Sequence, residues 1–133
     1  MKGIIFLLIF LILIKSILIS SNEIITIENL NCIYDKLESN LTCSGPKLKK
    51  FFNLNNFPKV KILIVNNCEI ELLEEYTFSN FSQLEILDIQ SNKIESFAVN
   101  SFNGLRNLIY LNLNGNRVKI IKKRSFFGLS YLK

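Results

Sequence analysis

The chain has 133 residues, 49% of them hydrophobic, and a formal net charge of +5. Without Lys2 and Lys15, which flank an apolar N-terminal run, 14 basic and 11 acidic side chains leave a net charge of +3. So small an excess does not indicate a protein that binds nucleic acid. The absence of histidine excludes the usual Ser-His-Asp and Cys-His catalytic arrangements.

Residues 1–20 have the pattern of a secretory signal peptide. Lys2 supplies the positive start, Ile4–Ile14 form an unbroken apolar run, and Ser20 or Ser21 offers a small residue for cleavage. The run is too short to span a bilayer. Because apolar residues continue almost to the cleavage site, an uncleaved signal anchor is the alternative. The sequence thus predicts a secreted, extracellular protein, with the cell-surface membrane as the alternative location.

Residues 21–59 predict an N-terminal cap over the repeats that follow. Ile24, Ile25 and Ile27 indicate a strand within it. A cap is physically required because the bare end of a repeat stack exposes apolar side chains and a strand edge.

The three cysteines indicate one disulfide in the cap. An exported chain meets an oxidising environment, and Cys68 is accounted for by the repeat pattern described next. Cys32 and Cys43 remain, and a bridge between them closes a loop of about a dozen residues, worth about 3 kcal/mol in the chain-entropy model. The sequence has no C-x-x-C pair and no histidine, so it contains no recognisable zinc site.

From residue 60 onward, one pattern returns every 24 residues. Its five positions are Val60, Leu63, Val65, Cys68 and Ile70; then Leu84, Leu87, Ile89, Asn92 and Ile94; then Leu108, Leu111, Leu113, Asn116 and Val118. This is the L-x-x-L-x-L-x-x-N/C-x-L pattern of leucine-rich repeats. It predicts units at 60–83, 84–107 and 108–131, with a fourth begun at Leu132. Since the chain stops there, we expect it to be C-terminally incomplete.

The predicted fold is an α/β solenoid, a leucine-rich-repeat horseshoe. Short parallel strands should line its concave face, and irregular or short helical segments its convex side. Further columns recur at the same period: Leu73, Phe97 and Ile121; Phe78, Phe102 and Phe126; Phe81, Leu105 and Leu129. The phenylalanine column could stack on a ligand, but a core spine fits its spacing better.

Certain polar and glycine positions have predicted structural roles. The amides of Asn92 and Asn116 can satisfy backbone groups where the chain leaves a strand, and the Cys68 thiol fills that slot in the first unit. Gly104 and Gly128 should need a positive φ, and Asn80 should replace glycine there in the first unit.

Strand alternation assigns a set of side chains to the concave face. They are Ile62, Ile64 and Asn66; Ile86, Asp88 and Gln90; Tyr110, Asn112 and Asn114. The apolar members form a strip beside amides, and exposed apolar strips often mark partner sites. The alternative is that the cap or a glycan covers the first two isoleucines.

Two N-glycosylation sequons occur, at Asn40 and Asn80. A basic cluster of Lys119, Lys122, Lys123 and Arg124 could attract sulfated glycans or anionic lipids, although a solvated outer face explains it more simply.

With these residues in view, the chain resembles extracellular leucine-rich-repeat proteins of the typical 24-residue class. These include Toll and Toll-like receptor ectodomains, Slit and secreted insect immune proteins. The resemblance implies a solenoid that recognises a protein or glycan ligand, in immunity or cell signalling, with no cofactor. It leaves a membrane-receptor ectodomain as the alternative, with membrane attachment only through a downstream span. A non-catalytic part of an enzyme is a further alternative. Glu74 and Glu75 do not form a catalytic pair, because they are adjacent, unlike the separated, facing carboxylates of glycosidases. Neither oligomeric state nor ligand identity follows from it.

Overall fold

The computed structural model describes residues 22–27, 30–45, 57 and 59–133. The expected signal peptide at 1–20 lies outside the described residues. Within them the chain forms eight strands and contains no helix. The helical component of the predicted α/β class is therefore wrong for this part of the chain, and the irregular alternative describes it.

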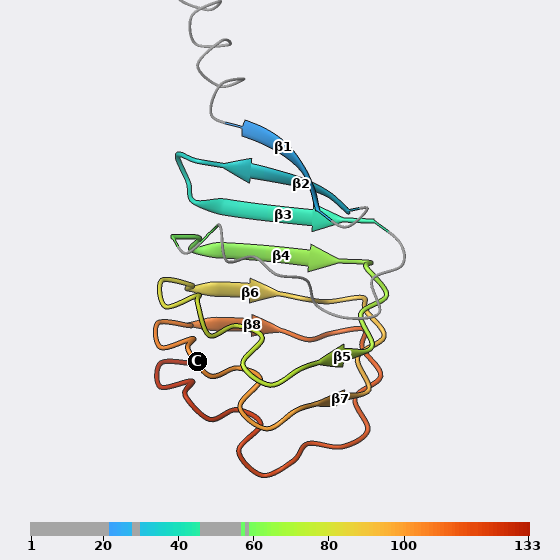
Figure 1. The fold of residues 1–133 in the computed structure, drawn as a ribbon. Coiled ribbons are helices and arrows are strands. Elements are labelled where there is room, and N and C mark those ends of the chain that lie inside the picture. Colours follow the sequence, from blue (N-terminus) through green and yellow to red (C-terminus); the bar gives the residue numbers. More distant parts are fainter. Residues whose placement is uncertain (1–21, 28–29, 46–56, 58) are drawn as a thin grey trace, which may run out of the picture.

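Six strands form one sheet (Figure 1). Three of them, β1 (Asn22–Ile27), β2 (Leu30–Asp35) and β3 (Asn40–Ser44), make an antiparallel meander. The sheet then continues with β4 (Ile62–Asn66), β6 (Ile86–Asp88) and β8 (Tyr110–Asn112), all parallel. Unexpectedly, β3 pairs parallel with β4. The meander is therefore continuous with the repeat sheet rather than only lying over its end.

The 24-residue period of the sequence is the register of the sheet. Ile62 pairs with Ile86, and Ile86 pairs with Tyr110. Along β4 the side chains alternate between partly exposed and buried, as one-sided burial of a strand requires. Each unit therefore contributes one strand, and residues 24 apart become neighbours.

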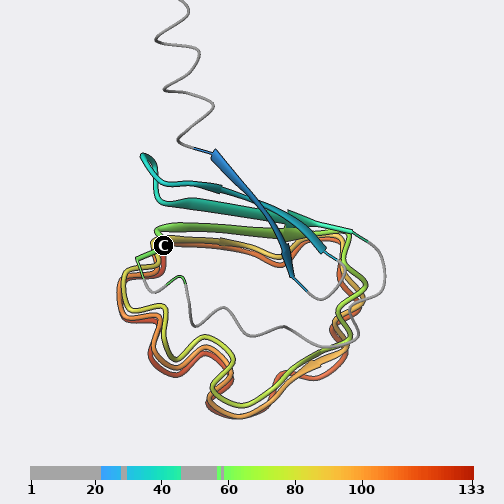
Figure 2. The same cartoon turned by 45° about the horizontal axis from the view of Figure 1, so that its top comes forward.

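The other side of each unit is made of turns and very short strands. A second, two-stranded parallel sheet joins β5 (Leu72–Leu73) to β7 (Ser96–Phe97), and an isolated bridge from Ser96 to Ile120 extends it. Figure 2 shows the successive units nearly superposed, with the main sheet along one side of the loop and these segments on the other. Side chains directed inward from both sides form the core.

Burial follows the repeat columns but weakens in the third unit. The apolar columns of the first two units are buried throughout. In the third unit Leu108 is fully buried, whereas Phe126 is 36% and Ile121 is 61% exposed. The Leu108 backbone N–H donates to the Leu105 carbonyl at 3.3 Å, in a tight turn that links the second unit to the third.

The phenylalanine column is a core spine. Phe78 and Phe102 are fully buried, and their rings stack at 5.8 Å with an interplanar angle of 11°. Phe102 stacks in turn on Phe126 at 5.4 Å and 17°, while Phe97 packs edge-on against Phe102. Offset and edge-on aromatic contacts add to the stabilisation from burial. The Phe78 and Phe102 rings are therefore packed against their neighbours rather than available to a ligand, whereas Phe126 at the end of the column is partly exposed.

Backbone conformation at the recurrent glycine slot differs between units. Gly104 and Gly128 adopt φ of 105° and 98°, as predicted, but Asn80 is not among the residues with positive φ. The prediction for Asn80 was wrong, because asparagine tolerates φ near 60° whereas φ near 100° is accessible essentially to glycine alone. The first unit therefore turns differently at this slot.

Two further recurrent positions have positive φ. They are Asn67, Ser91 and Gly115 after the main strands, and Tyr76, Asn100 and Arg124 on the opposite side. Only one of these six residues is a glycine, so their residue types did not predict the positive φ.

Gly104 offers a test of how closely successive units approach. A Cβ added at Gly104 would lie 2.7 Å from the Ser79 Cα and carbonyl oxygen, whereas one at Gly128 would meet nothing closer than 3.6 Å. Both glycines have similar φ, so Gly128→Ala measures the cost of that backbone conformation without the steric clash expected at Gly104. We expect Gly104→Ala to lower the free energy of unfolding by about 2–4 kcal/mol and Gly128→Ala by about 1 kcal/mol, measured by denaturant unfolding. Equal losses would show that the two backbones are not in close contact.

Candidate ligand-binding face

The predicted disulfide joins two neighbouring strands of the cap. Cys32 and Cys43 are directly paired across β2 and β3, with an S–S distance of 2.05 Å, and both are fully buried. Leu41 and Cys43 then lie beside Leu63 and Val65 of β4 in the buried rows. The cap therefore extends both the core and the outer surface of the repeats.

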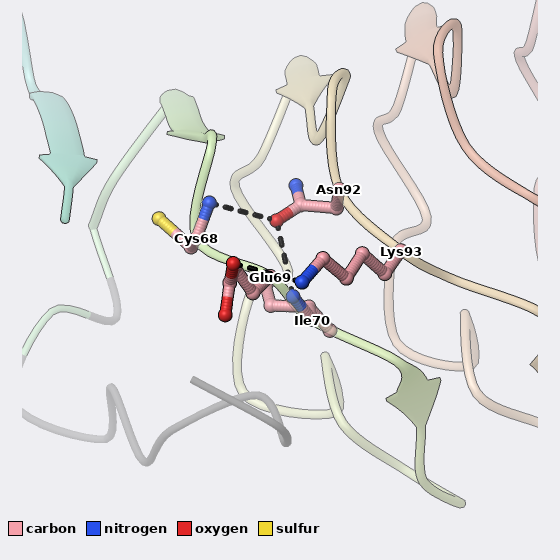
Figure 3. A network of polar contacts seen from close by, with 5 residues as sticks. All are labelled: Cys68, Glu69, Ile70, Asn92 and Lys93. Atoms are coloured by element: carbon pink, nitrogen blue, oxygen red, sulfur yellow. Dashed lines mark hydrogen bonds and ion pairs between the residues drawn. The ribbon is translucent and has the colours of Figure 1, made fainter. Parts of the chain in front are cut away.

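Asn92 holds the turn that follows the β4 strand (Figure 3). Its Oδ1 accepts the backbone N–H groups of Cys68 at 3.0 Å and Ile70 at 3.3 Å. Its Nδ2 donates to the carbonyls of Val65 at 2.8 Å, Ile89 at 3.0 Å and Gln90 at 3.2 Å. The residue is 4% exposed. One side chain thus satisfies buried backbone groups of two units, which would be costly to leave unpaired.

Asn116 makes the equivalent contacts one unit later. Its Oδ1 accepts the Ile94 N–H at 3.1 Å, and its Nδ2 donates to the Ile89 and Leu113 carbonyls at 3.0 and 2.8 Å. Both asparagines therefore have the structural role at the strand exit that their spacing predicts.

Cys68 fills this slot in the first unit. It is a free, buried thiol whose Sγ donates to the Asn66 carbonyl at 3.2 Å and to the more distant Cys43 carbonyl at 3.8 Å. Burial raises the pKa of the Cys68 thiol, and a backbone hydrogen bond with Gly45 partly opposes the rise. The thiol thus reproduces the donor half of the asparagine role.

The state of Cys68 can be measured with an alkylating reagent. We expect the native, oxidised protein to react slowly with iodoacetamide and to expose one thiol per chain in denaturant, since a buried neutral thiol is unreactive. The unfolded chain ionises this thiol above about pH 9 while the fold keeps it protonated, so stability should fall as the pH rises beyond that value. Rapid labelling of Cys68 in the native protein would contradict the burial.

Ion pairs also recur at the repeat period. Lys61 pairs with Glu85 at 3.0 Å, Glu69 with Lys93 at 2.8 Å (Figure 3), and Glu95 with Lys119 at 3.1 Å. All six side chains are substantially exposed, so each pair contributes little stability. These pairs were not predicted, although opposite charges at the same position of successive units are a sequence signal for them. Lys119 of the basic cluster is thus paired, and Lys122, Lys123 and Arg124 remain exposed side chains.

The outward side chains of the main sheet form a lattice of three rows, here named the strand face. The pairings give the rows as Asp35, Asn40, Ile62, Ile86 and Tyr110; Ile33, Thr42, Ile64, Asp88 and Asn112; and Asn31, Ser44 and Asn66, continued at the same repeat slot by Gln90 and Asn114. All nine predicted face residues lie in this lattice. The cap adds its own outward residues, which the sequence analysis did not include.

The chemistry of the strand face differs from row to row. Three apolar side chains, Ile62, Ile86 and Tyr110, follow one another in the first row, and Tyr110 is 50% exposed. The third row is made of amides and a hydroxyl. Between the rows, the Asp88 carboxylate accepts the Gln90 backbone N–H at 3.1 Å. A surface with an apolar strip, a carboxylate and amide side chains can contact a protein ligand through both apolar and polar groups.

A hollow of about 450 Å³ lies beside the edge of this face. Glu85, Asn107, Ile109, Tyr131 and Lys133 line it. The Lys133 N–H donates to the Ile109 carbonyl at 3.1 Å, which holds the last residues against the sheet edge. The repeat pattern does not predict this hollow, because residues from three separate segments form it.

The described residues contain no cluster of three or more Cys, Asp or Glu side chains able to hold a metal ion. In the same part of the chain, no helix has the length and apolar character needed to cross a membrane.

The parallel strands in 24-residue register and the strand-exit asparagines define a protein built from stacked repeats. The family model described as leucine rich repeat matches residues 58–118 and 82–133, together more than half of the chain. The chain belongs to the leucine-rich-repeat family. Domains of this family generally mediate protein binding and are typically not enzymes. No curated protein matches the chain.

Proposed function

We propose that this protein is a secreted recognition module that binds a protein ligand through its strand face. The observation that carries the proposal is the apolar row of Ile62, Ile86 and Tyr110 beside a row of amides. Accessible apolar side chains bordered by polar groups are typical of partner-binding surfaces. A glycan ligand is the alternative for the same face, because amides and an aromatic ring also suit sugars.

Export is part of the proposal, and three features of the chain support it. Residues 1–20 have the signal-peptide pattern, and the cap holds a buried disulfide between Cys32 and Cys43. Disulfides of this structural kind persist in oxidising compartments. The sequons at Asn40 and Asn80 are also consistent with an exported glycoprotein.

The ectodomain of a membrane receptor is the second candidate, because the same face would serve a receptor equally well. The sequence of the full-length transcript separates the two. A stretch of about 20 apolar residues downstream would assign the receptor, whereas further repeats and a closing cap without such a stretch would assign the secreted form.

A matched pair of tyrosines tests the strand face. Tyr110 lies on it and is 50% exposed, and Tyr76 lies in the turn after β5 and is 49% exposed. For a ligand selected from an array of extracellular proteins, we expect Tyr110→Ala to weaken binding at least about 10-fold, as for a hot-spot tyrosine. Tyr76→Ala should leave the affinity nearly unchanged. The reverse result would assign binding to the opposite side of the molecule.

A further inference from the structure

We propose that an Asn-linked glycan on Asn40 stands on the strand face, shelters its cap end and confines a protein ligand to the β6 and β8 end. The inference rests on the export included in the proposed function. It concerns the Asn40 sequon rather than the one at Asn80, because only the former lies on the binding surface.

The placement follows from the register of β3. Asn40 and Thr42 both project outward, since Leu41 between them is fully buried. Asn40 pairs with Ile62 of β4 on one side and with Asp35 of β2 on the other. Both reactive residues of the sequon are therefore on the strand face, next to its apolar row.

The Asn40 amide differs from the amides that hold the repeats together. Its Oδ1 is buried and has no hydrogen-bond partner among the described residues, whereas the Asn92 Oδ1 accepts two buried N–H groups. The glycan is attached through the other amide atom, Nδ2, and leaves this buried oxygen in place.

The modification is a group transfer that needs a lipid-diphosphate-linked oligosaccharide as donor, of the kind found in the eukaryotic secretory pathway. The Asn40 Nδ2 forms a bond to C1 of the first sugar and loses one proton. The bond from C1 to the diphosphate breaks, and the lipid diphosphate leaves. No oxidant or reductant takes part.

Distances across the sheet determine which residues the glycan shelters. Neighbouring strands are about 4.8 Å apart, which places Ile62 about 5 Å and Tyr110 about 14 Å from Asn40 along the same row. A bulky, hydrated glycan is therefore attached next to Ile62 and three strands away from Tyr110. Asn80 lies in an exposed turn outside the main sheet, so a glycan there would leave the whole row open.

Site occupancy is the first measurement. The full chain is expressed in eukaryotic cells, and the exported protein is treated with an amidase that removes Asn-linked glycans in heavy-oxygen water. Peptide mapping should find Asn40 converted to labelled Asp, with Asn40→Gln abolishing that signal and Asn80→Gln leaving it. Occupancy of Asn80 alone would overturn this inference while export stands. Retention of the chain inside the cell with both sequons empty would overturn the proposed export as well.

The second measurement tests whether the glycan shields Ile62 from solvent. Ile62→Cys and Tyr110→Cys are each labelled with a polymer-linked maleimide before and after the same protein is deglycosylated, so folding differences between variants do not enter. Since the glycan is bulky, we expect deglycosylation to speed labelling at Ile62→Cys at least about fivefold and to change labelling at Tyr110→Cys less than about twofold. Equal changes at both positions, or none at Ile62→Cys, would contradict the proposal.

Discussion

Asn92→Ala should lower the free energy of unfolding by about 3–5 kcal/mol, because it leaves several buried backbone groups unpaired at once. The N–H groups of Cys68 and Ile70 lose their acceptor, and the Val65 carbonyl loses a donor. The Ile89 carbonyl retains the Asn116 amide. The effect therefore falls mainly on the turn after β4.

Two variants at this slot sharpen the measurement by denaturant unfolding. Asn116→Ala should cost only about 1–2 kcal/mol, since Asn116 is partly exposed and makes fewer bonds. Asn92→Cys should give an intermediate loss, because a thiol can donate as Cys68 does but accepts poorly. A loss below about 1 kcal/mol for Asn92→Ala would show that water replaces the amide and that the buried network is wrong.

Phe102→Ala should be comparably severe, at about 3–5 kcal/mol. The ring is fully buried, stacks on Phe78 and Phe126 and receives the edge of Phe97. Its removal opens a cavity between two units, where the close-packed backbones cannot collapse easily.

Phe126→Ala is the matched control for the spine, because Phe126 belongs to the same column but is 36% exposed. Its loss should be clearly smaller, near 1–2 kcal/mol, since water can fill the space. Thermal unfolding of the oxidised protein gives both values. Equal losses for the two variants would mean that Phe102 is not the buried centre of the column.

The sequence predicted the parts of the fold that the repeat period controls. The spacing from Ile62 to Ile86 to Tyr110 became the sheet register, and the phenylalanines became a stacked spine. Each unit must bury the same positions, so the same apolar pattern occurs three times in the sequence. The Cys32–Cys43 bridge could be predicted equally well, because the third cysteine, Cys68, already had a position in the repeat pattern.

Features that depend on local backbone conformation or on contacts between units were not predictable in this way. Asn80 was assigned a glycine-like φ from its slot alone, yet φ near 100° excludes it. Tyr76 adopts a positive φ that its residue type gives no reason to expect. The parallel pairing of β3 with β4 also escaped prediction, because the cap has no period to reveal its register.

The candidate site shows the same division. Strand alternation selected all nine predicted face residues, while the cap contribution from Asn40, Thr42 and Ile33 required the observed pairing of β2, β3 and β4. That pairing places the Asn40 sequon on the proposed binding surface.

Photo-cross-linking from two exposed positions tests the recognition role of the strand face most directly. A benzophenone amino acid is placed at Tyr110 or at Tyr76, which are almost equally exposed on different sides of the molecule. The exported protein is then irradiated with its ligand. We expect an adduct from the Tyr110 position and none from the Tyr76 position. An adduct from Tyr76 alone would contradict recognition through the strand face.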